Sequence, residues 1–251
     1  MSKQSDSCTQ KSTKLTIKHL GDIKPLTENQ TKFFNAYDLG DYFIALHGVA
    51  GTGKSFCAIY KALQEVMTKG SGFNKLIVVR SAVQSRDIGH LPGNVDEKLD
   101  VYQQPYRQIC HNLFNRKDAW DLLIEDNRVE FISTSFIRGL TYDHAIIVVD
   151  ECQNMSFSEF NTIMTRIGYK SKILFCGDYR QTDLNKKQND KTGIFDFMSI
   201  ANTIEAFTKI EFGINDICRS SLVKDWIVAC DNFINKNTDT PTITPKEEIF
   251  I

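Results

Sequence analysis

Short apolar runs, separated by segments of helical or polar character, are the main pattern along the chain. Five or six of these runs are rich in β-branched residues and are apolar on both faces; the candidates are 42–48, 75–80, 129–133, 144–151, 172–178 and 208–212. Strands with two apolar faces are typical of a parallel sheet covered by helices on each side. The runs therefore predict the strands of one buried sheet.

Two segments between these runs have the spacing of amphipathic helices. In the first, apolar side chains recur from residue 56 to Met67, and Gly70 is placed to end the helix. In the second, Ser156 and Glu159 form a capping box, and the apolar positions that follow reach as far as Gly168. Strands that alternate with helices predict a doubly wound α/β domain.

The polar ends of the chain set the expected domain bounds. Residues 1–24 and 235–251 are polar and are expected to be tails, and residues 25–234 are expected to form one domain. The N-terminal segment lacks the apolar core of a secretion signal, and no apolar run approaches the roughly 18 residues that span a membrane. We therefore expect no membrane partner.

Charge and cysteine content narrow the function classes. The net charge of −1 gives no global basic field for nucleic acid or a membrane surface, although a local basic groove stays open. Seven cysteines occur without a C-x-x-C pair, which argues against a zinc site or a disulfide framework. Cys152 and Cys176 lie in or beside strand-like runs, where thiols act as small buried hydrophobes. A reducing cytoplasm is the expected compartment.

The stretch GVAGTGKS, residues 48–55, matches the pattern G-x-x-x-x-G-K-[ST] between a strand-like and a helix-like run. In that setting backbone N–H groups surround phosphates, here those of Gly48, Val49, Ala50, Gly51, Thr52 and Gly53. Lys54 would reach the β- and γ-phosphates, and the Ser55 hydroxyl would bind Mg²⁺. The alternative is a glycine-rich turn with an incidental Lys and Ser, but the flanking strand and helix favour a phosphate loop.

Polar residues that follow two later strands would complete a hydrolytic site. Asp150 and Glu151 end the run IIVVDE; the first could hold Mg²⁺ and the second could polarise an attacking water. Asp178 and Gln181 follow the next run, where a polar side chain could sense the γ-phosphate. Two solvated acids at a strand end would be unremarkable alone, but these elements share one edge of a parallel sheet.

The sequence gives only weak evidence about which nucleotide base is bound. A guanine-reading N-K-x-D is missing after the phosphate loop. The amide of Gln30 could pair with adenine, but Thr27 and Gln30 also form a T-x-x-Q capping box for a helix that contains Phe33 and Phe34. Spacing alone leaves these two roles evenly balanced.

Taken together, the motifs resemble those of the PhoH family of phosphate-starvation-associated ATPases. The resemblance runs through PLTENQ, GVAGTGKS, the LPG…EK…P segment, RGLTYDHAIIVVDECQNM, GDYRQTDL and CRSSLV, and covers most of residues 25–233. It implies a RecA-like P-loop NTPase core with a mostly parallel sheet and helices on both faces. It also implies ATP and Mg²⁺ as cofactors, Gln30 at adenine, Arg219 as a catalytic arginine, and the cytoplasm of a bacterium or a phage-infected host.

Two uses of ATP hydrolysis remain open. In the first, the protein is a helicase-like ATPase on RNA or single-stranded DNA, and a homo-oligomeric ring, such as a hexamer, lets Arg219 complete the neighbouring subunit's site. In the second, it is an ATP-dependent switch or scaffold acting on a protein partner. Basic side chains favour the first slightly, although a solvated surface is their usual explanation; they are Arg80, Arg86, Lys98, Arg107, Arg116 and Lys117. A small-molecule kinase lacks support, because Glu151 and Gln181 suit water activation better.

Overall fold

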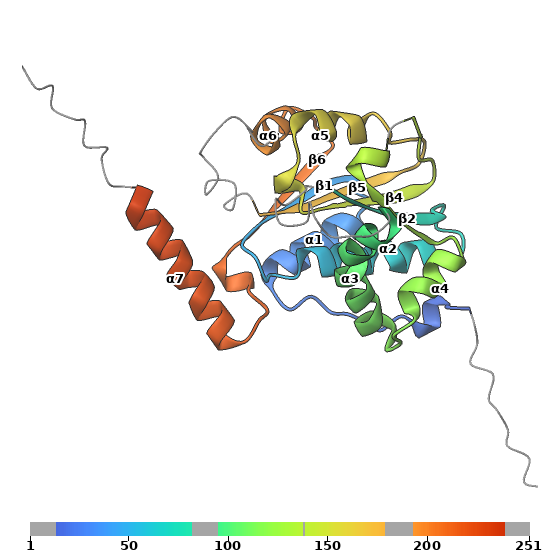
Figure 1. Cartoon of the computed structure of the whole chain (residues 1–251), viewed down its shortest axis with the longest axis horizontal. Helices are drawn as coiled ribbons and strands as arrows, with labels where there is room; N and C mark the ends of the chain where they lie inside the picture. The colour runs from blue at the N-terminus through green and yellow to red at the C-terminus, as the bar shows by residue number, and fades with distance from the viewer. Residues whose placement is uncertain (1–13, 82–94, 138, 179–192, 239–251) are drawn as a thin grey trace, which may run out of the picture.

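A central sheet of six strands organises the computed structural model, which describes residues 14–81, 95–137, 139–178 and 193–238 (Figure 1). The strands are β1 (Phe43–Gly48), β2 (Lys75–Arg80), β3 (Val129–Ser133), β4 (Ala145–Asp150), β5 (Lys172–Gly177) and β6 (Phe207–Phe212). Their order in the sheet is β3-β2-β4-β5-β1-β6, and every described strand pair is parallel. All six predicted strands are therefore confirmed.

Helices connect the strands and cover the sheet. The α-helices are α1 (Glu28–Asp38), α2 (Lys54–Met67), α3 (Val95–Phe114), α4 (Ala119–Glu125), α5 (Phe157–Met164), α6 (Ile194–Ala201) and α7 (Ser221–Thr238). Short 3-10 helices are η1 (Ile17–His19), η2 (Thr134–Phe136), η3 (Cys152–Asn154) and η5 (Ile214–Asp216). Among the described helices, none is both long and apolar enough to cross a membrane.

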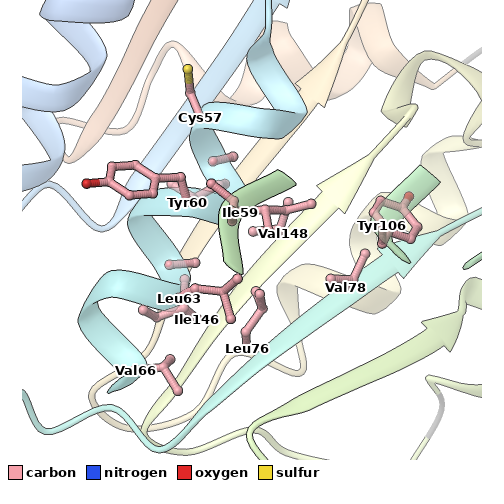
Figure 2. Packing of buried hydrophobic residues seen from close by; sticks show 14 of the residues in the cluster. Cys57, Ile59, Tyr60, Leu63, Val66, Leu76, Val78, Tyr106, Ile146 and Val148 are labelled. Atoms are coloured by element: carbon pink, nitrogen blue, oxygen red, sulfur yellow. The ribbon is translucent and has the colours of Figure 1, made fainter. Parts of the chain in front are cut away.

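Alternate residues of the central strands enter two separate cores. On β4, for example, Ile146 and Val148 join one core while Ile147 and Val149 join the other. The first core packs against α1 to α4, and the second packs against α5 and α6. Figure 2 shows part of the first core, where α2 lies over β2 and β4. The predicted α/β fold with helices on both faces of a parallel sheet is confirmed.

The second predicted helix ends earlier than its glycine suggested. Ser156 and Glu159 form the expected capping box of α5, but the helix ends at Met164. Gly168 lies beyond it, in a segment that pairs with Tyr142 through a β-bridge at Ile167. A Cβ at Gly168 would lie 2.6 Å from the Tyr142 carbonyl oxygen. This glycine therefore permits a close backbone approach and is not a helix cap.

Both ends of the expected domain differ in detail from the described structure. The segment expected to be a polar tail through residue 24 contains Leu15, which is buried in the first core, and the Gly21 N–H donates to the Leu113 carbonyl oxygen at 2.8 Å. At the other end, α7 continues past residue 234 to Thr238. Figure 1 shows α7 standing away from the sheet. Accordingly, large apolar side chains on it are exposed, among them Leu222, Trp226 and Phe233.

Candidate nucleotide-binding and hydrolytic site

The strand order brings the predicted motifs together at one edge of the sheet. β5 lies between β1, which leads into the phosphate loop, and β4, which ends in Asp150. Because the strands are parallel, the residues that follow all three emerge at the same edge, where α/β proteins bind ligands. A cavity of about 590 Å³ opens there. Its walls include Gln30, Ala50, Gly51, Thr52, Gly53, Lys54, Ser55, Asp150, Glu151, Asp178 and Arg219.

Glycines give the phosphate loop a shape that other residues would strain. Gly48, Gly51 and Gly53 have positive φ angles of 120°, 76° and 82°. A Cβ at Gly48 would meet the Phe212 carbonyl oxygen at 2.1 Å, so β6 packs too closely for a side chain there. The Thr52 hydroxyl closes the loop by donating to the Val49 carbonyl oxygen at 3.0 Å. Such a loop at the start of α2 suits a ligand with phosphate groups.

The Lys54 side chain lies against the phosphate loop and hydrogen-bonds to it. Its ammonium group donates to the Gly48 and Val49 carbonyl oxygens at 2.9 and 2.7 Å. Burial, the largest influence, lowers the pKa of Lys54, while Asp178 and neighbouring acids act in the opposite direction. A buried cation whose hydrogen-bond partners here are two carbonyl oxygens and the Thr52 hydroxyl would gain from an anionic partner, as a nucleotide phosphate would provide.

The predicted metal ligands are in direct contact. Ser55 Oγ donates to Asp150 Oδ1 at 2.6 Å, although the two residues are 95 positions apart in the chain. Burial raises the pKa of Asp150, and the hydrogen bond from Ser55 opposes that effect. A hydroxyl beside one carboxylate suits Mg²⁺, which takes few protein ligands and relies on nucleotide phosphates for others. The described residues contain no cluster of three or more His, Cys, Asp or Glu side chains suited to a metal.

A buried glutamine joins the predicted water-activating residue to the end of β5. Gln153 Nε2 donates to Glu151 Oε2 at 2.6 Å, and Gln153 Oε1 accepts from the Asp178 backbone N–H at 3.1 Å. Glu151 itself has a positive φ of 53°, a left-handed backbone conformation that is uncommon for a residue with a side chain. The structure thus brings Glu151 and Asp178 together through Gln153. Gln181, the fourth predicted residue of this group, lies outside the described residues.

Gln30 takes part in the N-terminal cap of α1, and its side chain contacts the phosphate loop. Thr27 caps α1 by accepting from the Gln30 backbone N–H at 3.3 Å. The Gln30 side chain, however, accepts from the Leu26 N–H at 2.8 Å and donates to the Thr52 carbonyl oxygen at 3.0 Å. The reciprocal half of the expected capping box is therefore made with Leu26, and the amide group lies against the phosphate loop.

Arg219 lies beside the phosphate loop of its own chain, and its supply to a neighbouring subunit stays a prediction. The Cys218 N–H donates to the Gly51 carbonyl oxygen at 3.1 Å. A Cβ at Gly51 would lie 3.1 Å from Cγ of Arg219, and Arg219 lines the cavity of its own chain. The reason is the short connection between β6 and α7, which runs beside the phosphate loop.

Sequence reasoning missed two buried residues at the site. Gln153 follows Glu151 by two positions. Its closeness in the sequence to an acidic strand end was the signal that could have identified it as a site residue. Tyr106 lies on α3, and its hydroxyl donates to Asp150 Oδ2 at 3.0 Å. No local pattern around Tyr106 points to Asp150, because the contact spans 44 positions and depends on how α3 packs.

The basic residues considered for nucleic acid are partly engaged in ion pairs. Arg107 pairs with Asp100 and Asp121, and Arg116 pairs with Asp118. Arg80 lies over the Tyr102 ring, 5.6 Å from its centroid. Arg86 and the side chain of Lys98 lie outside the described part of the chain, while Lys117 is exposed. These contacts agree with the solvated-surface interpretation for Arg107 and Arg116.

Comparisons with known proteins identify the family of the chain. The profile of the PhoH-like protein family matches residues 22–231. A PhoH-like protein of Bacillus subtilis is 31% identical over 210 residues, which cover 83% of this chain and 64% of the relative. Protein PhoH of Escherichia coli is 29% identical over 206 residues, covering 80% and 57%. The chain thus spans about three fifths of the length of these curated relatives.

Among solved structures, the large terminase from the thermophilic bacteriophage D6E is similar with a TM-score of 0.47 and 12% identity, covering 81% of this chain and 50% of the terminase. The sheet order, the phosphate loop after β1 and the acidic end of β4 identify a RecA-like P-loop NTPase fold, as the sequence predicted. With its profile matched over residues 22–231, the chain belongs to the PhoH-like family.

Proposed function

We propose that this protein is an Mg²⁺-dependent ATPase. The observation that carries the proposal is the 2.6 Å hydrogen bond between Ser55 and Asp150, which joins the phosphate loop to the acidic strand end. Lys54 and Glu151 line the same cavity. A fold of this type is built for nucleotide binding, and the family to which the chain belongs supports the same assignment.

Each residue would have a distinct role in hydrolysis. The loop N–H groups and Lys54 would hold the β- and γ-phosphates, and Ser55 and Asp150 would hold Mg²⁺. Bound Mg²⁺ would neutralise charge on the phosphate oxygens. Glu151 would orient and polarise the attacking water, and Gln153 would keep its carboxylate in place. Asp178, Gln181 and Arg219 would respond to charge on the γ-phosphate.

Adenine recognition is assigned to Gln30. Its amide carries both a donor and an acceptor and lies next to Thr52 of the phosphate loop. Adenine presents a donor and an acceptor side by side at N6 and N7, which one amide can satisfy together. The apolar side chains of Ile23, Leu26 and Phe56 also line the cavity and could enclose a planar base.

We assign the energy of hydrolysis to work on RNA or single-stranded DNA, as in a helicase or translocase. The test is phosphate release with ATP and Mg²⁺, measured with and without single strands of each nucleic acid at several salt concentrations. Stimulation that falls as salt rises would support coupling to nucleic acid. ATPase activity that no strand changes would contradict it, and absence of Mg²⁺-dependent phosphate release would contradict the ATPase assignment itself.

A second candidate function is an ATP-dependent switch that acts on a protein partner. The observation that favours it is the exposed apolar surface of α7, where Leu222 and Trp226 are 77% and 70% exposed. Apolar side chains grouped on one helix are typical of protein contacts. Because α7 follows Arg219 directly, such a contact would lie close to the nucleotide. The strand-stimulation assay above separates this candidate from the first.

A further inference from the structure

Each oxygen of the Asp150 carboxylate accepts a hydroxyl hydrogen bond. Ser55 donates to Oδ1 at 2.6 Å from the start of α2, and Tyr106 donates to Oδ2 at 3.0 Å from α3. Asp150 is 6% exposed. A buried carboxylate needs such donors, because water does not reach it in their place. The two contacts together fix the rotation of the carboxylate plane.

The Tyr106 ring has little freedom to move. It is fully buried and stacks on Trp120 of α4, with ring centroids 5.8 Å apart and an interplanar angle of 26°. On another side it meets Phe131 of β3, with centroids 5.7 Å apart. The Trp120 indole N–H is itself held by Gln103 Oε1 at 2.9 Å. Packing from two other elements therefore aims the Tyr106 hydroxyl.

The Tyr106 hydroxyl is the donor in its contact with Asp150. A carboxylate oxygen only accepts, so the hydroxyl supplies the hydrogen of the 3.0 Å bond to Asp150 Oδ2.

We propose that Tyr106 is a positioning residue for the metal site, which holds Asp150 Oδ2 so that Oδ1 is presented to Ser55 and the metal. The inference rests on the proposed role of Asp150 in holding Mg²⁺. It also links α3 to that role, because Pro105, Gln108 and Ile109 of the same helix line the nucleotide cavity. A shift of α3 would change the cavity wall and the metal ligand together.

The simpler explanation is a core tyrosine that has only found a partner for its hydroxyl. The two explanations differ in what Tyr106→Phe does to metal binding. The variant keeps the ring and removes one donor. If Tyr106 positions Asp150, Mn²⁺ binding in the presence of ATP, followed by electron paramagnetic resonance, weakens by about tenfold. ATP binding in EDTA stays within about twofold, because no phosphate contact is lost.

Tyr60→Phe is the matched control. Tyr60 is also buried in the first core, at 3% exposure, and its hydroxyl accepts from the Ile23 N–H at 3.3 Å, away from Asp150. Removal of the Tyr60 hydroxyl should leave Mn²⁺ binding at the wild-type level. A double-mutant cycle provides the second measurement: once Asp150→Asn is present, adding Tyr106→Phe should weaken Mn²⁺ binding little further.

Tyr106→His tests whether another ring donor can take the place of the hydroxyl, since histidine retains a ring N–H donor. Partial recovery of Mn²⁺ affinity relative to Phe supports the positioning role, and affinity at or below the Phe level contradicts it. Wild-type Mn²⁺ affinity in Tyr106→Phe would overturn the role of Tyr106 alone. A wild-type protein that binds no Mn²⁺ with ATP would overturn the proposed function and this inference with it.

Discussion

The Cys218 backbone N–H donates a 3.1 Å hydrogen bond to the carbonyl oxygen of Gly51, which places Arg219 beside the phosphate loop of its own chain. Arg219→Ala should therefore retain ATP binding but lower the rate of phosphate release, by about 10³-fold if the guanidinium stabilises charge on the γ-phosphate. Arg116→Ala is the control, because Arg116 pairs with Asp118 and does not line the cavity. Its rate should match the wild type.

Mixing of variants tests whether Arg219 acts within its own chain. When Arg219→Ala is mixed with Glu151→Gln under conditions where any subunits exchange, supply within one chain predicts no recovery, since each chain still lacks one residue. Recovery of phosphate release in the mixture would contradict supply within one chain. It would indicate that Arg219 of one subunit completes the site of another subunit.

Lys54→Ala should abolish ATP turnover and leave the fold intact. The hydrogen bonds of its ammonium group go to the phosphate loop, namely to the Gly48 and Val49 carbonyls and the Thr52 hydroxyl. Circular dichroism checks the fold and phosphate release checks turnover. Lys32→Ala, an exposed lysine paired with Glu28 on α1, is the control. Turnover close to the wild-type rate in Lys54→Ala would argue against a phosphate loop.

Substitutions at Asp150 and Glu151 should have different effects. Glu151→Gln keeps an oxygen that can accept from Gln153 but loses the carboxylate, so phosphate release should fall by about 10²-fold or more with ATP affinity nearly unchanged. Asp150→Asn should raise the Mg²⁺ concentration needed for ATP binding, by about tenfold. Calorimetric titration at several Mg²⁺ concentrations distinguishes them. Equal losses of nucleotide affinity would contradict the division of roles.

Gln30→Ala should weaken ATP binding by about tenfold and reduce the preference for ATP over GTP. The physical reason is the loss of an amide that lies against Thr52 of the phosphate loop. Thr27→Ala is the matched control: it removes the hydroxyl that caps α1, costs about 1 kcal/mol of stability and leaves the amide in place. If both variants are less stable but keep the wild-type preference for ATP over GTP, Gln30 only stabilises the N-terminus of α1.

Glu159 should make the stability of the fold depend on acidic pH. Burial acts to raise its pKa, but hydrogen bonds from Thr134, Ser156 and Ser81 outweigh burial and hold the pKa below 4.5. A carboxyl with a depressed folded pKa contributes stability above its unfolded pKa and loses it as pH falls through the folded value. Wild-type stability should therefore fall below about pH 4.5 partly through this group.

Glu159→Gln should lower stability at pH 7 by about 1–2 kcal/mol and flatten the decline in acid. Urea unfolding at pH 7 and between pH 5 and about 3 measures both effects. Glu205→Gln, at an exposed position, is the control. Parallel pH profiles for the wild type and Glu159→Gln would show that the carboxylate contributes no linkage.

The pattern of apolar residues was sufficient to predict the strands, and the GVAGTGKS motif was sufficient to predict the phosphate loop. The β4 residues Ile146 to Val149 are apolar on both faces, and the structure buries both faces between helices. Contacts that depend on the packing of a distant helix could not be predicted in this way. Tyr106 reaches Asp150 only because α4 and β3 seat its ring, and no local spacing encodes that geometry.

The place of Arg219 beside the phosphate loop of its own chain could not be predicted for a related reason. Arg219 is far from Lys54 in the sequence, and the parallel pairing of β6 with β1 returns the chain to the phosphate loop. Gly168 was misread, because a glycine after an apolar repeat has the same appearance whether it caps a helix or allows close backbone contact. Local signals do not separate these two uses.

The left-handed backbone conformation at Glu151 has opposite consequences for thermal stability and for the proposed activity. A residue with a side chain at φ 53° is strained relative to glycine, and Glu151 adopts this conformation directly after a buried strand. Glycine there would relieve the strain and delete the carboxylate. In a library selected only for survival at high temperature, glycine should therefore accumulate at this position and remove the proposed water-activating group, so directed evolution of a robust enzyme needs a selection for turnover at every round.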